Sequence, residues 1–290
     1  MNTILTLKDI DKSYGKQQAL HNISFTIKAG DIIGLIGENG AGKSTLIDIM
    51  AGIVRADAGE ITIAGQGAGF ENIYETLSFV FDEPVFYPKL TGYQNLRLWS
   101  DDSEAISYYL EQVGLEANKN KQTQDYSLGM RQRLSLARSF MTWKRMMVMD
   151  EPFNGLDPTI LSKVKKMLQQ GAKQGKAVLV SSHALKELMF FCNRFIFLHE
   201  GNIVALLSGK EHAFPSYDAY GDSNDKALLE ALEKNHMDYV KIPVLQGVYF
   251  KNDEDLPHGL SYQKIEAGTN VLEVIYMQMK KLHEKQGEAK

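Results

Sequence analysis

One stretch of the sequence sets the fold class: Gly37-Glu38-Asn39-Gly40-Ala41-Gly42-Lys43-Ser44. Its spacing matches G-x-x-x-x-G-K-S/T, the pattern of a phosphate-binding loop. The apolar residues 32–36 before it predict a buried strand, and residues 45–51 after it predict a helix that ends at Gly52. The loop therefore has the strand and the helix that this kind of site requires.

The residue types in the loop suit phosphate groups. Glycine at positions 37, 40 and 42 allows backbone conformations that other residues avoid, so successive N–H groups can point at phosphate oxygens near the positive end of the following helix. Lys43 would reach the outer phosphates, and the Ser44 hydroxyl would bind Mg²⁺. A turn that only joined a strand to a helix would not need Lys43 followed by Ser44.

The composition is that of a globular protein in a reducing compartment. A chain of 290 residues with 44% hydrophobic content can bury a substantial core, and a net charge of -4 argues against a surface that coats nucleic acid. The single cysteine, Cys192, excludes an internal disulfide, and we expect it to be buried on an apolar helix face. The sequence shows no signal peptide and no apolar run near the roughly 20 residues that span a bilayer, which predicts a cytosolic chain.

The first strands of the chain alternate apolar and polar residues. Residues 3–8 and 22–28 have this pattern, which is typical of half-buried antiparallel strands. Tyr14 lies at the tip between them. Such an aromatic is often simply packed or exposed, but ahead of a phosphate loop its flat ring could stack on a purine base.

Helices and strands alternate through the middle of the chain. Strands are predicted at residues 59–65, 77–81, 146–149 and 177–180, and helices, beginning with a capping box at Thr91 and continuing at 103–113, are inserted between two of them. This order predicts an α/β fold with a mostly parallel central sheet.

Polar residues follow three of the buried strands. Asp82 and Asp150 with Glu151 come directly after an apolar run, and His183 follows one after two serines; the carboxyl ends of parallel strands are where ligands bind. Asp150 could hold Mg²⁺ through water, Glu151 could polarise a nucleophilic water, and His183 could donate to a terminal phosphate. Helix caps, solvated loop charges and a structural histidine are the alternatives.

A second motif completes the pattern. Residues 126–133 read Tyr-Ser-Leu-Gly-Met-Arg-Gln-Arg and lead into a helix that Ser127 could cap. With this stretch, residues 1 to about 210 resemble the nucleotide-binding domain of ABC transporters. The resemblance implies a P-loop NTPase fold of ABC type, with an antiparallel β subdomain and an inserted helical subdomain at about residues 88–142.

The resemblance also implies roles for individual residues. ATP contacts are implied for Tyr14 as the adenine-stacking aromatic, for the Walker A loop from Gly37 to Thr45, and for Ser127, Gly129, Met130 and Asp157 in the signature and the D-loop. Mg²⁺ contacts are implied for Ser44, Asp82 and Asp150, with Glu151 as catalytic base and His183 as switch histidine.

The sequence departs from the family pattern at two places. Asp82 stands where the family usually has glutamine, and the signature reads Tyr-Ser-Leu-Gly-Met. A carboxylate can still contact Mg²⁺ or its water, and we hypothesise that Asp82 couples metal binding to the transporter contact. Both departures resemble a bacterial exporter subgroup linked to self-immunity and to export of antibiotics, peptides or lipids.

The family implies a mechanism and partners. Two nucleotide domains, identical or related, would pack head to tail around ATP, so that the phosphate loop of one faces Ser127 and Gly129 of the other. Their opening and closing would drive a separate integral membrane subunit from the cytoplasmic face of the membrane, without direct binding of the transported substrate or of nucleic acid. That subunit should dock near Phe86, Tyr87 and Leu90, for which ordinary core packing is an equal alternative.

Residues 195–206 predict a hairpin that closes the nucleotide-binding domain, placed at residues 1–210. Residues 211–290 predict a small α/β appendage with a helix at 225–235, strands at 239–245 and 247–252, and a final helix at 270–283. On this final helix Val271, Val274, Ile275 and Met279 are predicted to form one apolar stripe.

Other functions remain to be weighed against a transporter motor. A GTPase would need an N-K-x-D segment, which the sequence lacks. A cytosolic ABC ATPase that remodels ribosomes or DNA usually has two nucleotide domains or a long coiled-coil insertion, and this chain has one set of motifs without heptads. A regulator that has lost hydrolysis would not need Glu151 and His183.

Overall fold

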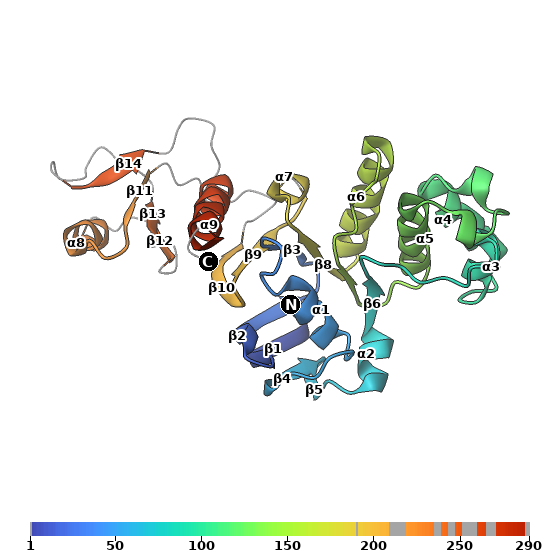
Figure 1. The fold of residues 1–290 in the computed structure, drawn as a ribbon, viewed down its shortest axis with the longest axis horizontal. Coiled ribbons are helices and arrows are strands. Elements are labelled where there is room, and N and C mark those ends of the chain that lie inside the picture. The colour runs from blue at the N-terminus through green and yellow to red at the C-terminus, as the bar shows by residue number, and fades with distance from the viewer. Residues whose placement is uncertain are drawn as a thin grey trace.

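The computed structural model describes residues 2–189, 191–208, 219–234, 239–242, 247–250, 260–264 and 271–287. A central sheet lies in the middle of the molecule, a helical arm extends from one side, and a small C-terminal unit lies on the other (Figure 1). In the described part of the chain, no helix is long and apolar enough to cross a membrane.

The central sheet has six strands in the order β10-β9-β3-β8-β7-β6. The five strands from β9 to β6 pair in parallel, and only β10 is antiparallel to its neighbour. The mostly parallel sheet is thus confirmed. The strands are β3 (Ile32–Ile36), β6 (Leu77–Val80), β7 (Met146–Met149), β8 (Ala177–Ser182), β9 (Arg194–His199) and β10 (Asn202–Ser208).

A second, antiparallel sheet has the order β2-β1-β4-β5. The predicted strands at residues 3–8 and 22–28 form here but are longer, because register shifts between Leu7 and Ile10 let the pairing continue where the alternation breaks. Tyr14 ends the first strand at the hairpin, as expected. The strands are β1 (Thr3–Tyr14), β2 (Gln17–Lys28), β4 (Ala58–Ile63) and β5 (Gln66–Gly67).

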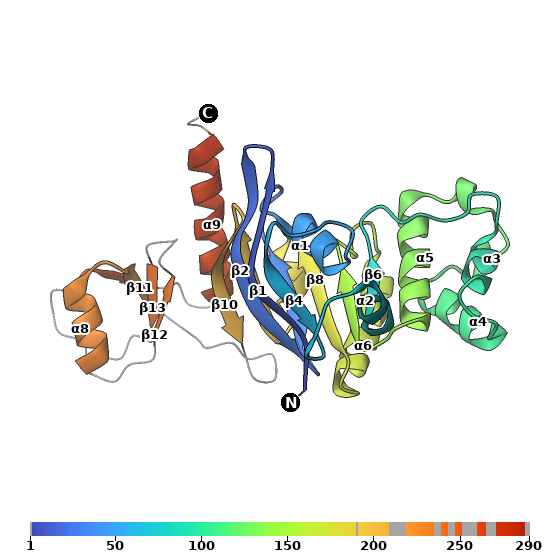
Figure 2. The same ribbon diagram turned by 90° about the horizontal axis from the view of Figure 1, so that it is seen from below.

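Helix α1 (Lys43–Met50) lies between the two sheets (Figure 2). Its buried residues, among them Leu46 and Ile47, join one hydrophobic cluster with the inner faces of β1, β2, β3 and β8. The phosphate loop is therefore held between a strand and a helix that are both packed on a core. This rigidity fixes the direction of the loop N–H groups.

The helical arm is inserted between β6 and β7. The predicted capping box is present: the Thr91 hydroxyl accepts from the Gln94 N–H at 3.1 Å, and the Gln94 side chain accepts from the Thr91 N–H at 2.9 Å. The arm and its neighbours comprise α2 (Phe70–Thr76), α3 (Gly92–Arg97), α4 (Ser103–Gln112), two 3₁₀ turns (Glu116–Asn118 and Thr123–Asp125) and α5 (Leu128–Met141). Helices α6 (Pro158–Lys173) and α7 (Leu185–Leu188) follow β7 and β8.

The C-terminal unit contains a four-stranded antiparallel sheet of order β12-β13-β11-β14. The predicted helix and the first parts of both predicted strands are present, while residues 243–246 and 251–252 of those strands lie outside the described residues. The elements are β11 (Ala219–Asp222), α8 (Lys226–Lys234), β12 (Tyr239–Ile242), β13 (Gly247–Phe250), β14 (Tyr262–Lys264) and α9 (Val271–Gly287).

Two predictions about buried residues were wrong in part. Cys192 is fully buried, but it lies in the turn before β9 and not on a helix face. On α9 the buried stripe is formed by Leu272, Ile275 and Met279, and Val274 is only half-buried, because the helix packs on the main core through a face rotated from the predicted one. The side chain of Val271 lies outside the described residues.

Candidate functional site

A pocket of about 810 Å³ opens at the carboxyl end of the central sheet. It brings together most of the residues that the sequence analysis selected. Those that line it are Tyr14, Asn39, Gly40, Gly42, Lys43, Ser44, Thr45, Asp82, Asp150 and Glu151.

The phosphate loop requires glycine for two separate reasons. At Gly37 a Cβ atom would lie 2.5 Å from the main-chain oxygen of Leu198, so a side chain would collide with β9. Gly42 has φ of 104°, and a Cβ there would lie 2.7 Å from the Ala19 oxygen on β2. The loop thus fits tightly between two strands. Gly37 and Ala41 are buried in it, and Glu38 is half-buried.

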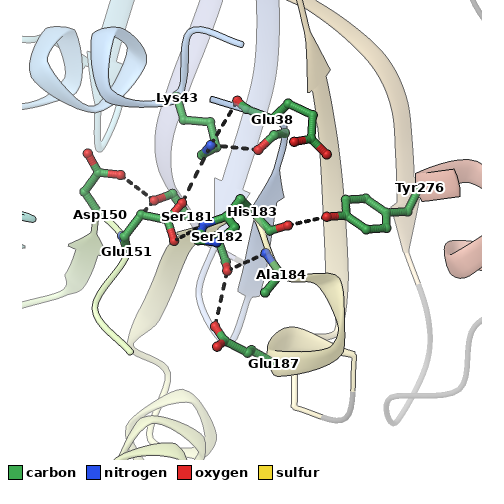
Figure 3. A network of polar contacts seen from close by, with 11 residues as sticks. Glu38, Lys43, Asp150, Glu151, Ser181, Ser182, His183, Ala184, Glu187 and Tyr276 are labelled. Carbon is green, nitrogen blue, oxygen red and sulfur yellow. Dashed lines mark hydrogen bonds and ion pairs between the residues drawn. The ribbon is translucent and has the colours of Figure 1, made fainter. Parts of the chain in front are cut away.

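Lys43 is buried, and its ammonium group points back onto the loop. Its Nζ donates to the main-chain oxygens of Gly37 at 2.7 Å and Glu38 at 3.3 Å, and lies 3.7 Å from Glu151 Oε1 (Figure 3). A cation held on loop carbonyls in this way is placed for a phosphate oxygen to replace them.

Ser181 on β8 links the two adjacent carboxylates. Its hydroxyl donates to Asp150 Oδ1 and accepts from the Glu151 N–H at 2.9 Å (Figure 3). Glu151 has φ of 44°, an unfavourable conformation for a residue with a side chain, which costs roughly 1–3 kcal/mol. The bond from Ser181 holds this conformation and aims the Glu151 carboxylate into the site.

His183 contacts the same carboxylate from the other side. Its Nδ1 lies 3.1 Å from Glu151 Oε2, and half of its side chain is exposed. His183 does not line the pocket itself, so it is brought to the site through Glu151. Between Lys43 and His183, Glu151 is placed to take a proton from a water molecule at the pocket wall.

Asp150 repels two other carboxylates near the pocket. Burial, followed by the charges of Asp150 and Glu83, raises the pKa of Asp82, and burial with the Asp150 charge raises the pKa of Asp48. A divalent cation beside Asp82 and Asp150 would relieve this repulsion, so the residues fit Mg²⁺. No group of three or more histidine, cysteine or carboxylate side chains is placed to hold a metal among the residues that the structure describes. Magnesium would therefore also need the Ser44 hydroxyl, water and phosphate oxygens, as Mg²⁺ sites in nucleotide enzymes do.

The signature and D-loop residues do not line the pocket of their own chain. Ser127 caps α5, where its hydroxyl accepts from the Met130 N–H at 3.2 Å, and Asp157 caps α6. The two segments adjoin, since a Cβ on Gly129 would lie 3.3 Å from the Gly155 oxygen. Ser127 and Asp157 are exposed.

The sequence analysis missed part of the pocket wall. Residues of β2 and of the β9–β10 turn line it, namely Gln17, Gln18, Ala19, His21, Glu200, Gly201 and Asn202. The His21 N–H donates to the Gly201 oxygen at 2.8 Å, and the Gly201 N–H donates to the Ala41 oxygen at 3.0 Å, which ties this turn to the phosphate loop. The hairpin at 200–202 was predicted, but its place beside the loop follows only from the pairing of β9 with β3.

A separate apolar groove of about 490 Å³ lies where β6 meets the helical arm. Phe86 is half-buried under the Arg138 guanidinium, 5.5 Å from its ring centroid, whereas Tyr87 is exposed and Leu90 half-buried. Phe86 and Leu90 are thus only partly packed and Tyr87 is not, and docking of a membrane subunit at this stretch stays a prediction. The groove is lined by Tyr74, Leu77, Ser78, Phe79, Phe81, Glu83, Pro84, Val85, Trp99, Arg138, Ser139, Thr142 and Lys144.

Known proteins share this arrangement. The family model described as ABC transporter matches residues 20–154. An uncharacterized ABC transporter ATP-binding protein of Bacillus subtilis, YdbJ, is 37% identical over 213 residues, which cover 71% of this chain and 69% of the relative. The bacitracin transport ATP-binding protein BcrA of Bacillus licheniformis is 33% identical over 70% of this chain and 69% of its own length.

The fold agrees with these sequence matches. A solved structure of an ATP-binding subunit of an ABC transporter superposes with a TM-score of 0.66 at 28% identity, over 71% of this chain and 90% of that one. The chain belongs to the ATP-binding proteins of ABC transporters, the ATP-hydrolysing motor subunits of these systems.

Proposed function

We propose that this chain powers a bacterial exporter of a peptide, an antibiotic or a lipid-like substrate. Two facts together support the proposal. The pocket contains the phosphate loop and carboxylates of an ABC motor, and the chain is 33% identical to a bacitracin transport ATP-binding protein. The chain would act as a peripheral subunit on the cytoplasmic face of the membrane, and the substrate would be bound by a separate membrane subunit.

The pocket supports the following contacts with ATP. Tyr14, about half exposed at its rim, offers a ring face to the adenine, and the N–H groups of the phosphate loop with Lys43 would hold the phosphates. Ser44, Asp82 and Asp150 would hold Mg²⁺, which would neutralise charge on the outer phosphates.

Hydrolysis would use the pair formed by Glu151 and His183. When phosphate replaces Glu151 as a partner of Lys43, the Glu151 carboxylate is free to accept a proton from the attacking water. His183 lies 3.1 Å from this carboxylate and would keep the carboxylate oriented. It would also approach the terminal phosphate.

A second nucleotide-binding subunit would complete the site. Ser127 and the N–H groups at Gly129 and Met130 stand at the first turn of α5, where an anion is favoured by the helix dipole. Because these residues and Asp157 do not line the pocket of their own chain, we infer that they contact ATP held by the partner. This arrangement explains a dimer that forms with ATP and opens after hydrolysis.

The apolar groove beside β6 would receive the membrane subunit. Val85 is 83% exposed and Trp99 49% exposed there, while Arg138 and Lys144 supply positive charge at the wall. Such a groove suits a short amphipathic helix with an apolar face and an acidic residue. Asp82 follows the strand that forms one wall of this groove, so a shift of the docked helix could reach the metal site.

The proposal can be tested in cells. The chain is expressed with a membrane protein that co-purifies with it from detergent extract, and the minimal inhibitory concentrations of peptide antibiotics are measured. We expect protection with the wild-type pair and none with Glu151→Gln. An active ATPase that gives no protection and co-purifies with ribosomes or DNA rather than with membranes would contradict the proposal.

A further inference from the structure

The C-terminal helix α9 reaches the catalytic centre from outside the nucleotide-binding domain. Leu272, Ile275 and Met279 bury one of its faces in the main core, and the helix packs against α7, which follows His183. In Figures 1 and 2, α9 lies beside β10, close to the central sheet, while β11 and α8 lie farther out. The helix therefore packs on the nucleotide-binding domain, although none of its described residues lines the pocket.

Tyr276 connects α9 to the switch histidine. Its hydroxyl donates a hydrogen bond to the main-chain oxygen of His183, and the side chain points from α9 straight at this carbonyl (Figure 3). The same residue, His183, holds Glu151 Oε2 at 3.1 Å through its ring. One hydrogen bond therefore separates α9 from the residue pair assigned to water activation.

The hydroxyl of Tyr276 stays a donor under working conditions. Burial, followed by the charge of Glu38, raises the pKa of Tyr276, so the group is protonated at neutral pH.

Lys280 connects α9 to the phosphate loop. It lies one turn after Tyr276 on the same helix face, with Nζ 3.9 Å from Glu38 Oε1 and 5.2 Å from the Tyr276 ring centroid. Glu38 Oε1 is buried and, within the described ranges, accepts no hydrogen bond. In the same part of the chain Lys280 forms the one ion pair of Glu38, so this buried charge in the loop is balanced from α9.

We propose that Tyr276 and Lys280 are positioning residues for ATP hydrolysis: α9 fixes the main chain of His183 and the charge of Glu38. This inference rests on the proposed function and deepens it. Tyr276 acts on the hydrolysis step through the orientation of the His183–Glu151 pair. Lys280 acts on ATP binding, because an unbalanced Glu38 carboxylate would repel phosphate.

The first test removes a single hydroxyl. In Tyr276→Phe the apolar packing of α9 is kept, and the hydroxyl's contacts with the His183 carbonyl and with Lys280 are lost. We expect kcat to fall about threefold to tenfold while KM for ATP changes less than about twofold, since the lost bond acts on the transition state. Tyr220→Phe is the matched control, because it deletes a hydroxyl that bonds Gln263 within the C-terminal sheet; its kcat and KM should equal those of the wild type.

The second test changes the charge. Lys280→Gln should raise KM for ATP about threefold with little change in kcat, and Lys280→Arg should restore the wild-type value. Lys226→Gln, on the exposed surface of α8, controls for the loss of one positive charge. The effect of Lys280→Gln should shrink at high ionic strength.

These measurements separate positioning from simple packing. A Tyr276→Phe protein with wild-type kcat, or one that loses kcat only in proportion to a loss of folded protein in thermal melts, overturns the role of Tyr276. A Lys280→Gln protein with wild-type KM overturns the role of Lys280. Wild-type protein without any ATP turnover would overturn the proposed function and both roles together, so the two failures are distinguishable.

Discussion

Glu151 shows how the site is built at the scale of single residues. Its backbone conformation, with φ of 44°, is unfavourable, and Ser181 holds it by a hydrogen bond. Glu200 has the same φ and also lines the pocket. At Glu200 the tight β9–β10 turn accounts for this conformation, whereas at Glu151 the contact with Ser181 on β8 supports it.

Asp82 gives a prediction about pH. In the unfolded chain its carboxyl titrates near 3.8, and in the folded chain burial and the Asp150 charge raise its pKa. Ionisation of Asp82 therefore lowers the free energy of unfolding. The full loss applies at pH values above the folded-state pKa, and there is no loss at pH values below 3.8. Without metal, Asp82→Asn should melt higher than the wild type at pH 7, by a small margin because this side chain is exposed, and the difference should vanish as the pH falls toward 4.

Thermal melts across this pH range provide the measurement. With Mg·ATP the order should reverse, because the wild-type carboxylate then has a cation beside it. A metal-free Asp82→Asn protein that melts lower than the wild type at pH 7 would show that Asp82 is stabilised by a partner and does not face Asp150.

Site residues that lie close together in the sequence could be predicted. The phosphate loop and the Asp150–Glu151 pair are recognisable because the chemistry needs those residues at fixed spacing after a strand. The contacts of Tyr276 with His183 and of Lys280 with Glu38 could not be predicted, because they join distant parts of the chain through the packing of α9.

Helix α5 gives a prediction at the scale of elements. Ser127→Ala removes an N-cap, which should cost about 0.5–2 kcal/mol of stability, and it also removes a hydroxyl that we assign to the partner's ATP. Asp102→Ala removes the cap of α4 in the same helical arm and is the matched control. Both variants should lose similar stability, but only Ser127→Ala should weaken ATP-dependent dimerisation, by about tenfold.

Chemical denaturation and light scattering in a Glu151→Gln background measure the two effects separately. If Ser127→Ala and Asp102→Ala dimerise equally well with ATP, Ser127 acts as a helix cap alone.

Elements were predicted where local signals are strong and missed where pairing is distant. The Thr91 capping box and the hairpin after β9 follow from short patterns, and both are present. Strands β11 and β14 were missed because they have only four and three residues, respectively, and are held by pairing with each other and with β13. The buried face of α9 was misjudged because its sequence offers apolar residues on adjoining faces.

At the scale of the whole molecule, the pocket of one chain does not include all the residues that we assign to ATP. The pocket holds the residues assigned to phosphate, Mg²⁺ and water, yet Ser127, Gly129 and Asp157 lie outside it. The sequence identified both sets of residues but could not show that they are separated in one chain. In the head-to-tail dimer that we propose, each set would lie beside the ATP held by the other chain.

The measurement that tests this pairing most directly is light scattering of purified Glu151→Gln protein with Mg·ATP, run beside an ATP turnover assay. Turnover should fall at least about a hundredfold, and the protein should become a dimer that reverts to a monomer with ADP. A Glu151→Gln protein that hydrolyses ATP at the wild-type rate, or that binds Mg·ATP and stays monomeric even with its membrane subunit present, would contradict the proposed motor.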